Sequence, residues 1–259
     1  MRKTAIMNLK GGTGKTVSTI NLAAFLAKKH GQRVLLIDAD SQGNLTEFVS
    51  EKIRDKGTIY DLLTGKECIA LQPTRMRQVD ILQADPRLMA LDITAAGMGA
   101  ADQMALKSFL AETSGLYDWT LIDCPPAFSA AAAAALIAAD NVIIPMKLDA
   151  FGIRGMANLL EQIRNMRKLN PKLHVAGVLP TMYYRSPEQD EAEGALRSAM
   201  HALGVQVFHH IRRSRQVDDS TFLQRPLLES SPKSGACRDY KVFTMDLMQA
   251  MKGGEQRGV

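Results

Sequence analysis

Cysteine is scarce in this sequence of 259 residues. The three cysteines, Cys68, Cys124 and Cys237, lie far apart and never form a C-x-x-C pair. A zinc site or a disulfide framework would need closer, repeated spacing, so the pattern argues against both. The sequence predicts ordinary thiols in a reducing compartment, with Cys124 buried.

Long apolar runs are also missing. No stretch reaches the about 18 consecutive apolar residues of a membrane span, and no cationic N-terminus leads into an apolar run as in a signal peptide. No low-complexity linker or repeat divides the chain. We therefore expect a cytoplasmic protein with no membrane segment. The expected organisation is a single nucleotide-binding domain over residues 1–259, in which 253–259 form a flexible tail.

The charge is unevenly distributed along the chain. Residues 1–150 carry 16 basic and 16 acidic side chains, whereas 151–259 carry 16 basic and 11 acidic ones. An excess of this size is usually a solvated face, but local clustering can make it a polyanion footprint. The densest positive cluster is formed by Arg212, Arg213 and Arg215.

Short apolar runs alternate with stretches of helical character. This alternation predicts an α/β fold, with a mainly parallel twisted sheet covered by helices on both faces. A close-packed helix is expected over Ala130–Ala135, because alanine is the best helix former. The expected strands are Thr4–Met7, Val34–Ile37, Val79–Leu82, Thr120–Ile122, Val142–Ile144 and Val175–Leu179.

A glycine-rich segment, residues 10–16, lies between the first expected strand and the amphipathic stretch Val17–Lys29. Glycines let backbone N–H groups converge on phosphate oxygens at a helix N-terminus, where the dipole favours anions. Lys15 would add a charge to the β- and γ-phosphates, and the Thr16 hydroxyl would be a ligand of Mg²⁺. The expected phosphate-loop contacts are Lys10, Gly11, Gly12, Thr13, Gly14, Lys15, Thr16 and Val17.

The loop departs from the general phosphate-loop pattern at two positions. Leu9 stands where that pattern has glycine, and Lys10 is an additional lysine. The sequence K-G-G-x-G-K-T resembles the deviant Walker A loop of the ParA/Soj, MinD and nitrogenase iron protein group of P-loop NTPases. The resemblance implies that Lys10 reaches across a dimer interface to the partner's nucleotide, whereas an isolated exposed lysine is more often only solvated.

Two carboxylates follow the second expected strand. An isolated Asp-x-Asp is more often turn or capping chemistry. However, the run Asp38–Thr46 resembles the D-x-D-P-Q-G-N motif of ParA proteins, with Ser41 in place of proline. The resemblance implies that Asp38 supports the metal shell and that Asp40 orients the attacking water. Lys10, Lys15 and Asp40 are thus the expected catalytic residues.

A third carboxylate, Asp123, ends the strand that precedes Pro125 and Pro126. An acid at this place, downstream of a phosphate loop, is typical of a Walker B aspartate in the Mg²⁺ coordination sphere. Thr16, Asp38 and Asp123 are therefore the expected metal residues.

The adenine side is less marked. Thr181 and Met182 follow the last expected strand, where related proteins contact the base. Asp149 resembles a family acid that approaches the nucleotide, but an acid that begins a helix is an equally good interpretation.

The resemblance extends over nearly the whole chain. It implies a Mg²⁺-dependent ATPase that forms a homodimer on ATP, binds double-stranded DNA non-specifically, and segregates plasmid or chromosomal DNA with a ParB-like centromere-binding partner. Such a protein would be associated with the nucleoid. Arg212, Arg213 and Arg215 fall in the C-terminal pattern where DNA-contacting arginines occur in the family.

Two other classes share this loop. A MinD-like membrane cycler would need a C-terminal amphipathic helix that inserts into lipid, and the segment Val242–Met251 instead predicts a helix packed on the core. An iron–sulfur reductase of the nitrogenase iron protein type would need cysteines at a dimer axis, and the three cysteines do not match that pattern.

Overall fold

A single mixed sheet organises the chain. The computed structural model describes residues 1–54, 56–66, 69–93 and 102–254, so Cys68 lies outside it. Within these ranges the strand order is β3-β4-β2-β5-β1-β6-β7, and every pair except β3–β4 is parallel. The strands are β1 (Arg2–Ile6), β2 (Val34–Asp38), β3 (Gln72–Pro73), β4 (Val79–Leu82), β5 (Trp119–Asp123), β6 (Asn141–Lys147) and β7 (His174–Thr181).

All six expected strands are confirmed, and one more strand, β3, was not predicted. It has two residues, one of them Pro73, and it pairs antiparallel with β4 at the edge of the sheet. A strand this short has no apolar run, and proline is tolerated at a sheet edge because no ladder donor is needed there. Only the position of its partner strand makes this segment extended.

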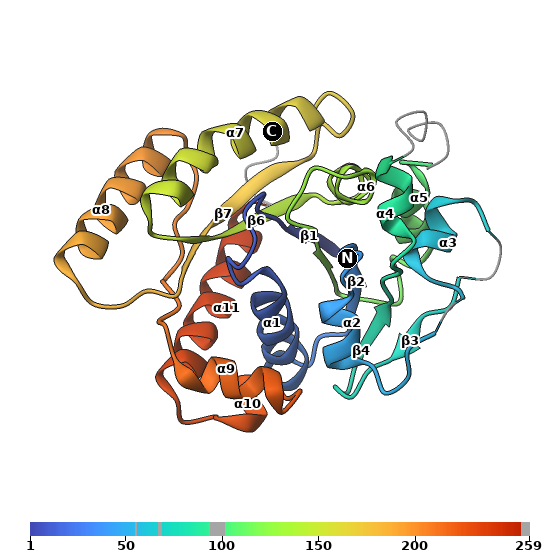
Figure 1. Cartoon of the computed structure of the whole chain (residues 1–259), viewed down its shortest axis with the longest axis horizontal. Coiled ribbons are helices and arrows are strands. Elements are labelled where there is room, and N and C mark those ends of the chain that lie inside the picture. Colours follow the sequence, from blue (N-terminus) through green and yellow to red (C-terminus); the bar gives the residue numbers. More distant parts are fainter. Residues whose placement is uncertain (55, 67–68, 94–101, 255–259) are drawn as a thin grey trace.

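Helices cover both faces of the sheet, as expected (Figure 1). The predicted alanine helix is α6, which continues to Ala138 and whose first turn is capped by the Ser129 hydroxyl, 3.1 Å from the backbone N–H of Ala132. The helices are α1 (Lys15–His30), α2 (Asn44–Val49), α3 (Ile59–Leu63), α4 (Leu88–Ile93), α5 (Ala105–Glu112), α6 (Ala130–Ala138), α7 (Ala150–Met166), α8 (Pro187–Ala202), α9 (Arg215–Phe222), α10 (Leu227–Ser230) and α11 (Gly235–Gly254).

The strands are buried on both faces, and alternate residues pack into two separate cores. In β2, Leu35 and Ile37 face the core beneath α6 and α7, whereas Val34 and Leu36 face the core beneath α1 and α11. This alternation is the period-2 geometry of a strand, and burial of both faces explains why these runs contain almost no polar residue.

The C-terminal helix packs on the core, which confirms the prediction for Val242–Met251. Phe243 and Leu247 of α11 are fully buried against α1. The helix also extends to Gly254, so residues 253 and 254 of the predicted tail are helical, and the rest of that segment lies outside the described residues. Across the described ranges, none of the helices has the length and apolar content to cross a bilayer. Cys124 is fully buried, as predicted.

Candidate functional site

The phosphate loop connects β1 to α1 at the carboxyl edge of the sheet. Gly12 and Gly14 have φ angles of +66° and +83°, in the left-handed region that favours glycine. Gly14 is the N-cap of α1, and no side chain caps the first turn of this 16-residue helix. Its first N–H groups are therefore available to an anion, which the helix dipole also favours.

Lys15 lies inside this loop. Its side chain is 7% exposed, and Nζ donates to the backbone carbonyl of Lys10 at 3.3 Å. Burial lowers the pKa of Lys15, while the carboxylate of Asp123 works in the opposite direction. A buried ammonium has three N–H donors, so besides the Lys10 carbonyl it can bind a phosphate oxygen.

Lys10 lies at the outer side of the same loop and is held by an acid far away in sequence. Its Nζ donates to both carboxylate oxygens of Asp149, at 3.0 and 2.9 Å. Asp149 is also the N-cap of α7 and accepts from the backbone N–H of Gly152 at 2.6 Å. The interpretation of Asp149 as a helix-start acid is thus confirmed, and the structure adds an ion pair with Lys10 that the sequence did not indicate.

Asp38 and Asp123 lie side by side at the ends of β2 and β5, where they are register partners. The Thr16 hydroxyl donates to Asp123 Oδ2 at 2.6 Å, and Asp123 Oδ1 is buried without a hydrogen-bond partner among the described residues. Thr46 donates to Asp38 Oδ2 through its N–H and its hydroxyl, both at 2.8 Å. Burial raises the pKa of Asp38 to about 6, and burial together with Asp38 raises that of Asp123.

These groups can supply part of the coordination shell of a hard cation, and other ligands would complete that shell. The partnerless Asp123 oxygen and the Thr16 hydroxyl are oxygen donors of the kind that Mg²⁺ takes. Within the described part of the chain, no three His, Cys, Asp or Glu side chains gather into a self-sufficient metal site. An ion here would need oxygens from a bound phosphate and water, as Mg²⁺ in nucleotide sites does.

Asp40 is half-buried and lies in a tight turn before α2. It accepts from the backbone N–H of Gln42 at 3.0 Å, and its own carbonyl accepts from Gly43 at 2.9 Å. Gly43 has a φ of +67°, which the turn requires. These bonds keep the turn closed although Ser41 replaces the proline of the family motif.

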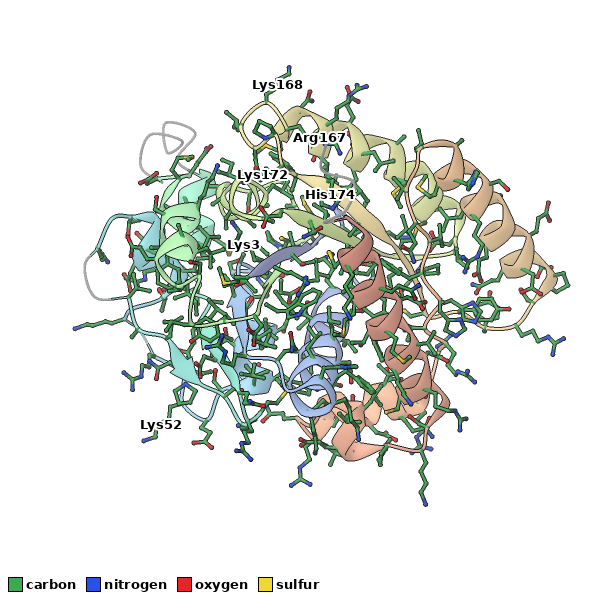
Figure 2. All side chains as sticks on the ribbon, turned by 180° about the vertical axis from the view of Figure 1, so that it is seen from behind. Lys3, Lys52, Arg167, Lys168, Lys172 and His174 are labelled. Atoms are coloured by element: carbon green, nitrogen blue, oxygen red, sulfur yellow. The ribbon has the colours of Figure 1, made fainter. Side chains whose placement is uncertain are left out.

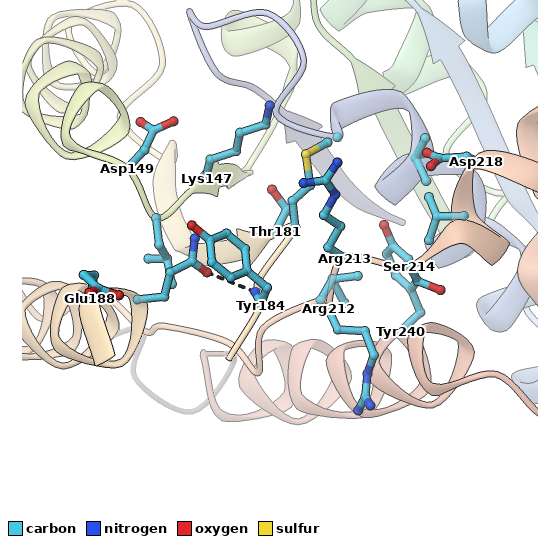
Figure 3. Close-up of a pocket in the computed structure, with 17 residues that line it drawn as sticks. Lys147, Asp149, Thr181, Tyr184, Glu188, Arg212, Arg213, Ser214, Asp218 and Tyr240 are labelled. Carbon is cyan, nitrogen blue, oxygen red and sulfur yellow. Dashed lines mark hydrogen bonds between the residues drawn. The ribbon is translucent and has the colours of Figure 1, made fainter. Parts of the chain in front are cut away.

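Two hollows flank the phosphate loop and share Gly14, Val17 and Met182. One, of about 630 Å³, contains the loop glycines, Lys15 and Asp40. The other, of about 490 Å³, is lined also by residues of β7, α8 and α11 (Figure 3). A nucleotide could place its phosphates in the first hollow and its nucleoside in the second, because the loop is their common wall.

Thr181 and Met182 do different things at this wall. The Thr181 hydroxyl lies within hydrogen-bond distance of the carbonyls of Thr13, at 2.9 Å, and Met146, at 3.1 Å, so it ties the phosphate loop to the sheet. Met182 has a left-handed φ of +55° and is exposed at the mouth of both hollows.

The second hollow also contains residues that the sequence did not single out. The backbone N–H of Tyr184 donates to Gln189 Oε1 at 3.1 Å, which fixes both at its wall (Figure 3). Ser214 and Tyr240 approach from the opposite side. Their proximity depends on how β7, α8 and α11 pack, and no local pattern marks it.

The three arginines lie in three different environments. The guanidinium of Arg212 donates to both carboxylate oxygens of Asp239 in α11, each at 2.7 Å. Arg213 lines the second hollow, with its side chain directed away from that of Arg212 (Figure 3). The side chain of Arg215 is 88% exposed, and its Nε lies 3.7 Å from Asp219 Oδ1. The prediction that all three contact DNA stays a prediction.

Comparison with known proteins agrees with this geometry. The family model described as an AAA domain matches residues 1–175. The chromosome partitioning protein ParA of Caulobacter vibrioides is 33% identical over 93% of this chain and 91% of its own length. The chromosome-partitioning ATPase Soj of Thermus thermophilus is 34% identical over 96% of both chains.

Solved structures agree as well. Apo McdA of Cyanothece has a TM-score of 0.83 over 97% of this chain and 99% of its own, with 24% identity, so it shows the fold alone. A cobyrinic acid a,c-diamide synthase of Mycobacterium smegmatis with bound ADP and magnesium is 29% identical, with a TM-score of 0.77 over 98% of this chain and 96% of its own. Because the ParA and Soj relatives match over nearly the whole chain and the family model matches residues 1–175, this chain belongs to the ParA/Soj family of chromosome-partitioning ATPases.

Proposed function

We propose that this protein is an ATP-dependent dimerising switch that hydrolyses ATP, binds DNA non-specifically and segregates DNA together with a ParB-like partner. The observation that carries the proposal is one phosphate loop with two lysines in different settings. Lys15 is buried within the loop, whereas Lys10 at the start of the loop is partly exposed and paired with Asp149. The Lys10 side chain is 38% exposed, so a second copy of the chain can reach it.

The loop residues have separate tasks in this proposal. The N–H groups of residues 11–16 and the Lys15 ammonium bind the β- and γ-phosphates. Thr16, Asp123 and Asp38 would hold Mg²⁺, which neutralises phosphate charge when bound. The similar cobyrinic acid a,c-diamide synthase contains ADP and magnesium. The water that attacks the γ-phosphate would be oriented by Asp40.

Lys10 would complete the site in trans. In the single chain its charge is balanced by Asp149 at 2.9 Å. ATP in the first hollow adds negative charge beside the mouth through which a second copy approaches. Lys10 then leaves the Asp149 carboxylate and binds the partner's phosphates instead. This change couples the nucleotide state to dimerisation.

Two substitutions test this cycle. Asp40→Ala should bind ATP and accumulate as a dimer, because only the positioning of water is lost. Lys10→Ala should bind ATP and remain monomeric. Sedimentation with ATP distinguishes the two states, and a normal hydrolysis rate for Asp40→Ala or normal dimerisation of Lys10→Ala would remove the assigned role.

DNA binding is proposed through the exposed arginine at the start of α9. The Arg215 side chain is 88% exposed, whereas the guanidinium of Arg212 is paired with Asp239. One contact per subunit becomes two in the dimer, so affinity for random-sequence duplex DNA should require ATP. Removing both contacts should make the slope of log K against log salt shallower by roughly 1.8, since each phosphate contact contributes about 0.9.

A matched control removes one positive charge at the amino end of β7. Lys168 is exposed in the turn between α7 and β7, near Arg167 and Lys172 (Figure 2). Lys168→Ala should leave the ATP-dependent affinity and its salt slope unchanged, while Arg215→Ala changes both. Equal effects of the two substitutions would contradict the assignment of Arg215. A wild-type dimer with no affinity for DNA at low salt would contradict DNA binding itself.

A further inference from the structure

An unusually exposed apolar pair, Phe222 and Leu223, lies at the end of α9 beside the phosphate hollow. Phe222, the last residue of α9, is 87% exposed, the highest value among the large apolar side chains of the described residues, and Leu223 beside it is 60% exposed. Phe222 lines the same hollow as Gly12 and Asp40, together with Thr221. Single exposed apolar residues are common on protein surfaces, but aromatic side chains are enriched at interfaces, and Phe222 is exposed at the rim of a polar site.

The fold holds this pair in solvent, and a frayed helix end does not explain the exposure. Gln224, the next residue, has a left-handed φ of +47°, and its side chain accepts from Arg75 at 2.7 Å. The N–H of Leu227 donates to the Asn21 side chain of α1 at 2.9 Å. The turn after Phe222 is thus anchored to the phosphate-loop helix, and a strained backbone retained by such tertiary bonds is often part of a binding function.

The charges around the hollow indicate what covers it. Asp40 and Glu47 lie in the same hollow as Phe222, so an approaching surface that carries positive charge is favoured at its mouth. A second copy of this chain brings the opposite charge, because its Lys10 lies at the outer side of its own loop. In an interface with two-fold symmetry every contact occurs twice, so one apolar anchor in each chain contributes two contacts to the dimer.

We propose that Phe222, supported by Leu223, is an apolar anchor of the interface that forms with a second copy when ATP is bound. The inference rests on the proposed ATP-dependent dimer and assigns a residue to it. Exposed in the single chain, Phe222 loses contact with water only when the partner covers the hollow. The anchor strengthens the dimer without touching the metal residues Thr16, Asp38 and Asp123.

The test uses a chain with Asp40→Ala, which is expected to accumulate as the ATP dimer. Adding Phe222→Ser should raise the dimer dissociation constant at least tenfold in sedimentation with ATP, while binding of a fluorescent ATP analogue to the monomer changes less than twofold. Phe222→Leu should restore most of the association, because it keeps an apolar side chain. The matched control is Leu169→Ser. Leu169 is 56% exposed and lies after α7, at the amino end of β7, so its replacement should leave dimerisation unchanged.

Four outcomes would overturn the inference. The dimer constant of Phe222→Ser could equal that of the Asp40→Ala parent, which removes Phe222 from the interface while the proposed function stands. ATP binding could be lost together with dimerisation, which assigns Phe222 to the nucleotide. Adsorption to anionic phospholipid vesicles could fall while the dimer is unaffected, which assigns the pair to a membrane. If the parent itself fails to dimerise with ATP, the proposed function fails and the inference with it.

Discussion

Replacing Arg212 should destabilise the folded chain, because the residue neutralises a buried carboxylate. Asp239 is 1% exposed and accepts three hydrogen bonds from Arg212, one from the backbone N–H at 3.1 Å and two from the guanidinium at 2.7 Å. Arg212→Ala keeps the backbone bond and removes the other two together with the charge. Breaking a buried ion pair costs 3 to 5 kcal/mol as a rough range, and half of the Arg212 side chain is in solvent.

We therefore expect the free energy of unfolding to fall by about 3 kcal/mol, at the lower end of that range. For a chain of this size the melting temperature should fall by roughly 6 to 12 °C. Denaturant titration and calorimetry measure both quantities. Arg215→Ala, which removes the same charge from an exposed position, should change the free energy by less than about 0.5 kcal/mol.

The pH dependence gives an independent check. Burial works to raise the pKa of Asp239, but the hydrogen bonds from Arg212 outweigh it and leave that pKa below its usual value. A depressed carboxyl pKa contributes stability that is fully present above the unfolded value of about 3.9 and is lost as the pH falls through the folded value. Without the guanidinium, burial would raise the pKa of Asp239 in Arg212→Ala, so the difference between wild type and variant should shrink progressively as the pH falls from neutrality through about 4.

Two results would refute this reasoning. A loss below about 1 kcal/mol would mean that water replaces the guanidinium around Asp239. A loss that does not shrink in acid would mean that packing of Arg212 against Gly235 carries the effect instead of charge. The same experiment decides how DNA binding is tested, because a variant that lacks Arg212 would lose affinity through unfolding whether or not this arginine touches phosphate.

Three other substitutions test the site and the sheet. Lys15→Ala should abolish ATP binding in calorimetry, and retained affinity would contradict the phosphate-loop assignment. Asp149→Asn keeps an N-cap for α7 but removes the charge that holds Lys10. Dimerisation on ATP should then strengthen by up to about fivefold in sedimentation, since an exposed ion pair contributes at most about 1 kcal/mol. Weaker association would refute the idea that Asp149 restrains Lys10. Gly177→Ala should cost about 1 to 3 kcal/mol in denaturant titration, because the new Cβ would lie 2.5 Å from the ring of Phe208 in its present position; an unchanged midpoint would show that the ring moves aside freely.

The contrast between Arg212 and Arg215 shows where sequence reasoning ends. Both lie in the same charged run, and the pattern of charges predicts one basic surface. Whether an arginine faces solvent or a buried acid depends on Asp239, which lies on another element, α11. A count of charges contains no information on that distance.

The sequence by itself determined the features that depend on neighbours along the chain. Two-sided burial gives short apolar runs, and the glycines of the phosphate loop are needed at φ values of +66° and +83°, so the sheet strands and the loop could be predicted from local patterns. Only the tertiary structure decided which distant groups meet. Thr16 reaches Asp123 across 107 residues, and Lys10 reaches Asp149 across 139. These pairs exist because parallel strands bring their carboxyl ends to one edge of the sheet, and the packing of that edge decides which side chains touch and how exposed each one is.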